Sequence, residues 1–263
     1  MKVLIVGASG FLGRSIVKKA LILKWDVWGT YNKNPNFIPD GCKKISIQDL
    51  NKLDDGYNLV YIAVGNFTLN QEDLSYANKE IPTQIIQKFK SSKIIFISSI
   101  SIHDPTPYGL AKLEGELIVS RHKKYAIIRF TNLYGIGMNK KSFIPKIIKD
   151  AIAKKVITLT NKGERIHDYL YIDDAADLCI KAGLKTGNKI YLGATGKMVS
   201  NLKIAKIIQR LIPDCQIIFS GKDSAPSYSF NPKDTMKKLS WLPQKKIEDG
   251  IKELVKHYES ISI

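Results

Sequence analysis

Tyr108 and Lys112 are the residue pair in this chain whose types and spacing best suit proton transfer. They occur in the order Tyr-Gly-Leu-Ala-Lys, and a spacing of four places both side chains on one face of a helix. An ammonium beside a phenol favours the phenolate, so we expect Lys112 to lower the pKa of Tyr108 towards neutrality. Tyr108 would then act as a general acid or base. The alternative is an ordinary exposed Tyr–Lys pair.

Ser98 and Ser99 stand at the end of an apolar run, shortly before this helix. Ligands of parallel sheets bind beyond the carboxyl ends of the strands. A serine hydroxyl at such an end is therefore expected to share a substrate oxygen with Tyr108. A polar strand end that leads into a turn is the alternative interpretation.

Three glycines, Gly7, Gly10 and Gly13, follow a short apolar run at residues 3–6. A glycine-rich turn between a strand and a helix exposes backbone N–H groups and the positive end of the helix dipole, which suits a pyrophosphate. Gly7 would permit the tight turn, Gly10 the approach of the phosphates, and Gly13 the packing of the helix on the strand. The spacing is G-x-x-G-x-x-G rather than G-x-G-x-x-G, and a plain strand–helix turn is the alternative.

Alternating strands and helices must position these residues. Strands are predicted at residues 3–6, 26–30, 44–47, 59–64, 94–98 and 126–130, with helices at 11–23, 76–90 and 108–122. This alternation predicts an α/β fold with a Rossmann-type, doubly wound parallel sheet. Further helices are predicted at 143–154, 173–184 and 201–211, and short strands at 156–159, 189–192 and 216–219. We expect a dinucleotide-binding core over 1–135 and a small, mainly substrate-binding C-terminal lobe over 136–263, with segments that return to the core.

The composition limits the kinds of partner. The net charge is +17, but the basic residues are mostly scattered lysines with only five arginines, which disfavours a nucleic-acid partner. No apolar stretch reaches the length of a membrane span, so no membrane partner is expected. The three cysteines are far apart and odd in number, which favours reduced thiols in a cytoplasmic protein and no metal site.

The combination of these motifs resembles the extended short-chain dehydrogenase/reductases, in the NAD-dependent epimerase/dehydratase family that acts on nucleotide sugars. The resemblance rests on several segments from end to end of the chain. They are residues 7–13 (GASGFLG), 63–65 (AVG), Asn78, 97–103 (ISSISIH), Tyr108 with Lys112, 129–135 (RFTNLYG), 165–174 (RIHDYLYIDD), 231–232 (NP) and 239–243 (LSWLP).

The resemblance implies a role for each matching residue. Tyr108 would exchange a proton with a sugar oxygen, Lys112 would bind the nicotinamide ribose, and Ser99 would hold the oxygen as charge develops. A hydride would move between the nicotinamide and the carbon that bears this oxygen. The expected cofactor-binding residues are Gly7, Ser9, Gly10, Phe11, Leu12, Gly13, Thr30, Asn32, Lys33, Ile47, Ala63, Val64, Gly65, Tyr108 and Lys112. The expected substrate-binding residues are Ser99, Ser101, Asn132, Arg165 and His167. The family also implies a homodimer.

Departures from the family pattern narrow the expected reaction. Relatives that dehydrate their substrate carry an Asp-Glu pair directly after the catalytic hydroxyl, whereas this chain has Ile100 and Ser101. We therefore expect redox chemistry at one carbon, with a 4-keto nucleotide-sugar reductase favoured by the short segment between Ser99 and Tyr108. The alternatives are a nucleotide-sugar 4-epimerase and a dinucleotide-binding relative without catalysis. His167 stands where the family often has an arginine, a role that Arg165 would then take.

The end of the second strand bears on the choice of cofactor. NAD-specific members carry an acidic residue there, which binds the ribose hydroxyls. This chain offers Thr30, Asn32 and Lys33, and its Asp26 lies at the wrong end of the strand. A hydroxyl, an amide and a cation would accommodate a 2′-phosphate, so NADP(H) is expected in preference to NAD(H).

Overall fold

The structure is a computed structural model that describes residues 1–65, 70–222 and 227–261. By its internal contacts the chain divides into two compact units, and each is discontinuous in sequence. The first unit comprises residues 1–130, 175–193 and 235–241, and the second comprises 131–174, 194–234 and 242–263.

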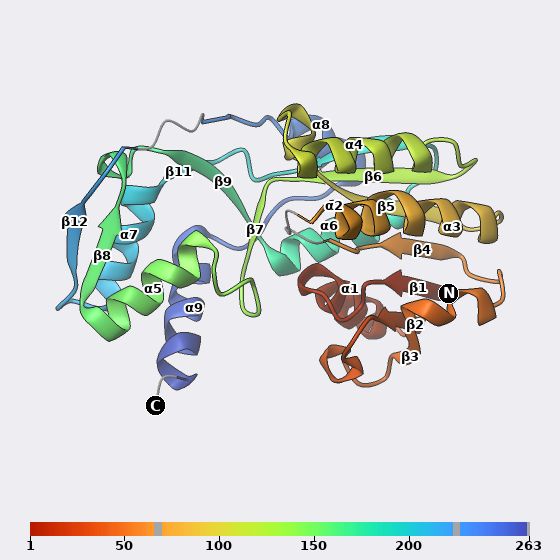
Figure 1. Ribbon diagram of the computed structural model, residues 1–263, viewed down its shortest axis with the longest axis horizontal. Helices are drawn as coiled ribbons and strands as arrows, with labels where there is room; N and C mark the ends of the chain where they lie inside the picture. The colour runs from red at the N-terminus through yellow and green to blue at the C-terminus, as the bar shows by residue number, and fades with distance from the viewer. Residues whose placement is uncertain (66–69, 223–226, 262–263) are drawn as a thin grey trace. The chain divides into compact units, whose positions relative to one another are not determined.

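A seven-stranded sheet forms the centre of the first unit (Figure 1). Its strands are β1 (Lys2–Val6), β2 (Asp26–Tyr31), β3 (Lys43–Ser46), β4 (Leu59–Ile62), β5 (Lys93–Ser99), β6 (Tyr125–Phe130) and β10 (Lys189–Gly193). They lie in the order β10-β6-β5-β4-β1-β2-β3, and every neighbouring pair is parallel. The prediction of a Rossmann-type parallel sheet is confirmed. The strand order reverses between β1 and β4, which is where such sheets bind their ligands.

The connections of this unit contain helices and short 3₁₀ turns. The α-helices are α1 (Phe11–Ile22), α2 (Gln71–Ser75), α3 (Ile81–Lys88), α4 (Pro107–Val119), α6 (Ile172–Leu184) and α8 (Lys233–Leu239). The 3₁₀ turns are η1 (Pro35–Phe37), η2 (Ile47–Lys52) and η4 (Ile100–His103). Helices α6 and α8 each begin in the second unit and continue in the first.

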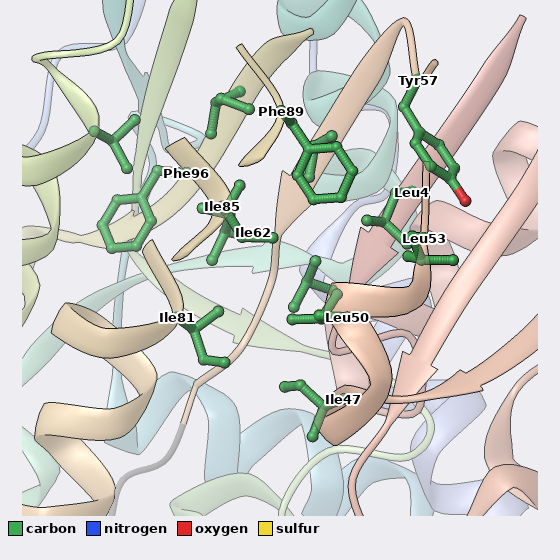
Figure 2. Packing of buried hydrophobic residues seen from close by; sticks show 14 of the residues in the cluster. Leu4, Ile47, Leu50, Leu53, Tyr57, Ile62, Ile81, Ile85, Phe89 and Phe96 are labelled. Atoms are coloured by element: carbon green, nitrogen blue, oxygen red, sulfur yellow. The ribbon is translucent and has the colours of Figure 1, made fainter. Parts of the chain in front are cut away.

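Apolar side chains from these elements fill one face of the sheet. Figure 2 shows Ile81 and Ile85 of α3 close to Ile62 and Phe96, which belong to the strands. The buried members of this cluster are Leu4, Val6, Ile47, Leu50, Leu53, Tyr57, Val60, Ile62, Ile81, Ile85, Phe89, Ile94, Phe96, Val119 and Ile127. Burial of a side chain of this size stabilises the fold by about 1.5–3 kcal/mol. The cluster therefore fixes the strands whose ends carry the candidate site described below.

The helix predicted at residues 76–90 is divided in the structure. A π-helical turn, η3 (Tyr76–Glu80), separates α2 from α3. Pro82 is the second residue after this turn, and a proline lacks the N–H group that would bond the carbonyl four residues earlier, that of Asn78. The wider turn accommodates this missing donor.

The described residues of the second unit form two small sheets and three long helices. Strands β11 (Met198–Ser200), β9 (Ile166–Tyr171) and β7 (Asn132–Tyr134) form one sheet, and β12 (Gln216–Phe219) pairs with β8 (Val156–Leu159) in the other. The helices are α5 (Phe143–Lys154), α7 (Asn201–Leu211) and α9 (Ile247–Ile261), with a short turn η5 (Asn161–Gly163). The sequence analysis did not predict β7, β9, β11, α8 or α9.

Two further observations concern the chain as a whole. In the part of the chain that the structure describes, no helix is both long enough and apolar enough to cross a membrane. Cys42, Cys179 and Cys215 are buried free thiols.

Candidate active site

Ser99, Tyr108 and Lys112 come together where β5 ends and α4 begins. Ser99 is the last residue of β5, and its hydroxyl accepts a hydrogen bond of 3.1 Å from the backbone N–H of Ser101. The same hydroxyl is hydrogen-bonded to the Tyr108 side chain. Lys112 lies one helical turn later, with its Nζ 6.0 Å from the centroid of the Tyr108 ring. The structure thus unites the three predicted catalytic residues.

The start of α4 determines where Tyr108 lies. Thr106 caps the helix, since its Oγ1 accepts a hydrogen bond of 3.1 Å from the N–H of Gly109, and Pro107 occupies the first helical position. A Cβ atom on Gly109 would lie only 2.1 Å from the carbonyl oxygen of Ser101 and 2.5 Å from that of Asp104. Glycine at this position is therefore what allows the helix to approach the turn that follows Ser99.

The ammonium of Lys112 is buried at the carboxyl end of the sheet. The residue is 2 % exposed, and its Nζ donates to the carbonyl oxygens of Ile97, at 2.9 Å, and Val64, at 3.4 Å. An ammonium carries three donors, and these two bonds leave one N–H for a ligand. Burial lowers the pKa of Lys112 to about 8, although the nearby carboxylate of Glu116 raises it.

The pKa expected for Tyr108 requires a correction. Burial raises the pKa of Tyr108 to about 12, and the hydrogen bond with Ser99 opposes this increase. The prediction that Lys112 brings this pKa towards neutrality was wrong, because the loss of hydration is the largest effect on the buried phenol. Tyr108 is therefore a protonated phenol at neutral pH, ready to donate.

The glycine turn lies beside the same strand ends. Gly7 has a φ of +90°, and a Cβ there would lie 2.9 Å from the carbonyl oxygen of Ala63 and 3.0 Å from the nitrogen of Val64. A Cβ on Gly13 would lie 2.1 Å from the carbonyl oxygen of Gly7, so only glycine lets α1 pack on the turn. Because the carbonyl oxygen of Val64 also accepts a hydrogen bond from Lys112, one backbone segment links the glycine turn to α4.

The first turn of α1 fits a dinucleotide pyrophosphate. Its N-cap is Gly10, and within the described residues no side chain caps the helix. The first N–H groups of such a helix need acceptors, and a phosphate supplies them. Ser9, Phe11 and Leu12 belong to the same turn, and Leu12 is buried against the core.

The remaining predicted cofactor residues lie in different environments. Thr30 is fully buried, and its Oγ1 accepts a hydrogen bond of 2.9 Å from the N–H of Gly7. Asn32 and Lys33 are exposed after β2, whereas the side chain of Ile47 packs into the apolar cluster of Figure 2. Gly65 is exposed, and a Cβ there would meet no described atom within 4 Å.

Three predicted substrate residues, Asn132, Arg165 and His167, belong to the second unit, and Ser101 belongs to the first. Strands β7 and β9 are parallel neighbours, with Asn132 opposite Tyr169. The Asn132 side chain donates to the carbonyl oxygen of Asp168 at 3.2 Å. His167 pairs in register with Val199 of β11. This small sheet therefore carries Asn132 and His167, and Arg165 directly precedes β9.

Asp168, which the sequence analysis did not single out, holds this region together. It is fully buried, and its carboxylate accepts hydrogen bonds from the backbone N–H groups of Thr195 and Gly196 and from the hydroxyls of Thr131 and Thr195. The distances are 2.7–3.0 Å for the shortest bond from each donor. A buried carboxylate needs such donors. Asp168 therefore joins Thr131 to the distant segment that contains Thr195 and Gly196.

The sequence analysis also missed the environment of Ser98. Ser98 donates to the buried carboxylate of Glu116, which is bound at the same time by Arg129. The sequence did contain an indication of Glu116. It follows Lys112 by four residues, the same spacing that separates Lys112 from Tyr108, which places all three on one face of the helix. In the described part of the chain, no cluster of three or more His, Cys, Asp or Glu side chains has the arrangement of a metal site.

Known proteins resemble this chain over almost its whole length. A putative UDP-glucose 4-epimerase from Methanocaldococcus jannaschii is 25% identical, and the alignment covers 96% of this chain and 97% of that protein. The solved structure of UDP-glucuronic acid 4-epimerase from Bacillus cereus, in complex with UDP-glucuronic acid and NAD, has a TM-score of 0.85 at 19% identity and covers 99% of this chain and 100% of that one. MoeE5, in complex with UDP-glucose and NAD, has a TM-score of 0.83 at 17% identity, with 100% of both chains covered.

These findings correct the expected cofactor. Both structures named above contain NAD, and nothing in the comparisons favours NADP(H), so the predicted preference for NADP(H) was wrong. The structure supplies a physical reason for part of the error. The hydroxyl of Thr30, which was expected to accommodate a 2′-phosphate, is buried and accepts a hydrogen bond from the glycine turn instead.

The family itself is shown by a match that covers more than half of the chain. Residues 3–192 match the model of the family described as "NAD dependent epimerase/dehydratase family". This span includes the glycine turn, Ser99, Tyr108, Lys112 and the strands that carry Asn132 and His167. The resemblance to extended short-chain dehydrogenase/reductases is thereby confirmed, and the chain belongs to the NAD dependent epimerase/dehydratase family.

Proposed function

We propose that this protein is an NAD(H)-dependent oxidoreductase that reduces a 4-keto nucleotide sugar at one carbon. The observation that carries the proposal is the meeting of Ser99, Tyr108 and Lys112 at the end of β5, joined through Val64 to the glycine turn. The resemblance to the family implies that these residue types act on a sugar oxygen beside the nicotinamide.

The protonation states suit reduction. Tyr108, with its pKa raised to about 12 by burial, donates its proton to the oxygen of the ketone. The Ser99 hydroxyl binds the same oxygen and stabilises the charge that develops on it. NADH, when bound, would supply the hydride for the carbon that bears this oxygen.

The groups available for the cofactor fit NAD(H). The uncapped first turn of α1 would hold the pyrophosphate, and Gly7, Gly10 and Gly13 would allow it to approach the backbone. Lys112 donates to two backbone carbonyls, and its third N–H would bind a hydroxyl of the nicotinamide ribose. The description of the family as NAD dependent supports this choice of cofactor.

Redox chemistry at one carbon is favoured over dehydration by the residues that follow Ser99. Dehydration requires an acid and a base beside the oxidised carbon, and Ile100 and Ser101 supply neither a carboxylate nor another group that ionises near neutrality. Removal of water is therefore not expected.

The proposed substrate is a nucleotide diphosphate sugar, because the two solved relatives described above hold UDP-sugars. We assign its binding to Asn132, Arg165 and His167, with Ser99 and Ser101 near the reacting sugar. The amide, the guanidinium and the imidazole are groups that bind hydroxyls and phosphates.

A 4-epimerase is the second candidate. It is favoured by the full-length similarity to the putative UDP-glucose 4-epimerase of Methanocaldococcus jannaschii. An epimerase needs the same proton and hydride transfers, but it returns the hydride to the opposite face of the sugar and consumes no cofactor overall.

A turnover assay separates these candidates. Purified protein is mixed with NADH and a 4-keto sugar nucleotide, and the loss of NADH absorbance is followed. In parallel, UDP-glucose and UDP-galactose are incubated with protein and NAD, and products are separated by chromatography. Stoichiometric NADH loss supports a reductase, and interconversion without net NADH supports an epimerase.

The Tyr108→Phe variant tests the mechanism in either case. It should bind NAD normally, as measured by calorimetry, and lose turnover by about 10²–10⁴-fold. Unchanged turnover contradicts the role given to Tyr108. NAD binding without turnover of any nucleotide sugar favours a dinucleotide-binding relative without catalysis.

We also propose that the protein forms a homodimer. Leu110 and Leu117 are 57% and 58% exposed and lie seven residues apart on one face of α4. Apolar side chains exposed at such a spacing form a stripe suited to helix packing. Light scattering coupled to size exclusion should give twice the mass of the chain, and a monomer at micromolar concentration contradicts the proposal.

A further inference from the structure

Glu116 is a buried carboxylate one helical turn after Lys112. It is 4% exposed, and it accepts a hydrogen bond from the hydroxyl of Ser98. Arg129 binds it through two nitrogens, with Nε 2.9 Å from Oε1 and Nη2 2.6 Å from Oε2. A carboxylate can be buried only when such donors satisfy it, so this contact is a buried, fully hydrogen-bonded ion pair rather than a surface ion pair.

The partners of Glu116 join three elements. Ser98 of β5 and Arg129 of β6 are opposite one another in the parallel register, and Glu116 of α4 binds both. The neighbouring residue, Gly115, lets the helix approach the sheet, because a Cβ there would lie 2.4 Å from the Phe96 ring. The helix is therefore fixed in position along the strands by a charged contact at this point.

The same contact determines the surroundings of Lys112. Tyr108, Lys112 and Glu116 recur every four residues, which keeps all three on one face of α4. Around the Lys112 ammonium lie the carbonyls of Ile97 and Val64 and the Phe96 ring, 5.0 Å from Nζ at its centroid. The titratable or charged groups described on this face are Tyr108 and Glu116 of α4 and Arg129 of β6.

We propose that Glu116 is a positioning residue for the reaction, which holds Tyr108 and Lys112 of α4 in register with Ser99 of β5 by tying α4 to β5 and β6, and which supplies the negative charge that keeps the buried ammonium protonated. Ser98 and Arg129 act with it, since they hold the carboxylate in place. The inference rests on the proposed function for the role of Lys112, but the charge state of Lys112 can be measured without any substrate.

The Glu116→Gln variant tests this inference. The amide keeps the shape of the side chain and a hydrogen bond with Ser98, and it removes the charge. We expect the pKa of Lys112 to fall by about one unit, because an opposite charge at close range favours the charged form. The readout is an NMR titration of protein labelled at lysine Cε, in which the Lys112 signal is identified by its absence from Lys112→Met. Glu259→Gln, an exposed glutamate of α9, is the control and should leave the titration unchanged.

Kinetics give a second readout. If the ammonium form of Lys112 is the active one, kcat falls on the alkaline side of the pH profile. In Glu116→Gln this alkaline limb should move to lower pH by the same amount as the Lys112 titration, by about one unit, with kcat affected more than KM. A role confined to stability would lower the melting temperature and leave both the limb and the titration where they are.

The outcomes are separable. A folded Glu116→Gln protein with an unchanged Lys112 titration overturns the inference. If Glu116→Gln does not fold, the double variant Glu116→Gln/Arg129→Gln also removes the guanidinium that would be left unpaired. The Lys112 titration is then measured in this double variant, where a smaller fall in the pKa of Lys112 is expected. Failure of both variants to fold, with Lys112→Met stable, also overturns it in favour of a purely structural contact. Absence of turnover in the wild type contradicts the proposed function. The NMR titration still tests the effect of Glu116 on Lys112 in that case, because it needs no substrate.

Discussion

Gly109→Ala places the contact between α4 and the preceding turn under direct test. The added methyl group would lie 2.1 Å from the carbonyl oxygen of Ser101 and 2.5 Å from that of Asp104. Both atoms belong to the backbone, so they cannot rotate away as the end of a flexible side chain would. Either the helix or the turn must shift, and Tyr108 is the residue next to the substitution.

Two effects of opposite sign determine the change in stability. Alanine in place of glycine stabilises a helix interior by about 1 kcal/mol. Overpacking costs about 1–3 kcal/mol, and two contacts with backbone atoms this close argue for the upper end of that range. The net expectation is a loss of about 2 kcal/mol in the free energy of unfolding, which corresponds to a fall of about 5 °C in Tm for a chain of this size.

The functional effect should be larger than the effect on stability. Displacement of Tyr108 from Ser99 by about 1 Å is expected to lower kcat by about 10²-fold, because proton transfer depends on close alignment. Calorimetry gives Tm, and the NADH assay described above gives kcat. The control is Glu114→Ala, an exposed position on the same helix, where the change in stability should stay within about 0.5 kcal/mol. A rise in Tm for Gly109→Ala would refute the reasoning, since helix propensity would then have outweighed the contact with the turn.

Three further variants test other parts of the site. Thr30→Val removes the acceptor of the hydrogen bond from the Gly7 N–H. Calorimetry should then show weaker NAD binding, and the free energy of unfolding should fall by about 1–3 kcal/mol. Unchanged NAD affinity and unchanged stability would contradict the role of Thr30. Burial lowers the pKa of Lys112 from 10.5 to about 8, so the unfolded chain binds a proton between these values that the folded chain lacks. The stability of wild type relative to Lys112→Met, measured by urea unfolding, should therefore rise from pH 8 to pH 10.5, and a flat difference would speak against the burial of this ammonium. Asp168→Ala leaves two backbone N–H groups without their acceptor and should lower the free energy of unfolding by about 3 kcal/mol, a loss that circular dichroism during denaturation can measure.

The regular elements of the first unit were predictable because their signals are local. A buried parallel strand must be apolar on both faces. The short apolar runs at β1, β4, β5 and β6 meet this requirement, so each strand can be recognised from a few consecutive residues. The glycines of the first turn are likewise required by the close approach of neighbouring backbone, which their spacing already indicates.

The second unit was harder to predict because its strands are short. Strand β7 has only three residues, and β11 has three as well, too few for an alternation to show. Helix α9 does carry a helical pattern, with Ile251, Leu254, Val255 and Tyr258 buried, but Gly250 interrupts it. That glycine lies against Tyr134, where a Cβ would be 2.4 Å from the hydroxyl, and this is a tertiary reason that no local pattern contains.

The sequence by itself determined the fold class and the glycine turn, and it pointed to Ser99, Tyr108 and Lys112 as the side chains proposed to react, because each depends on residues close together along the chain. Only the tertiary structure decided the protonation of Tyr108, the engagement of Thr30 with Gly7, and the contact of Glu116 with Ser98 and Arg129. Desolvation and the pairing of buried charges depend on which distant segments surround a group, and that is fixed by packing rather than by spacing.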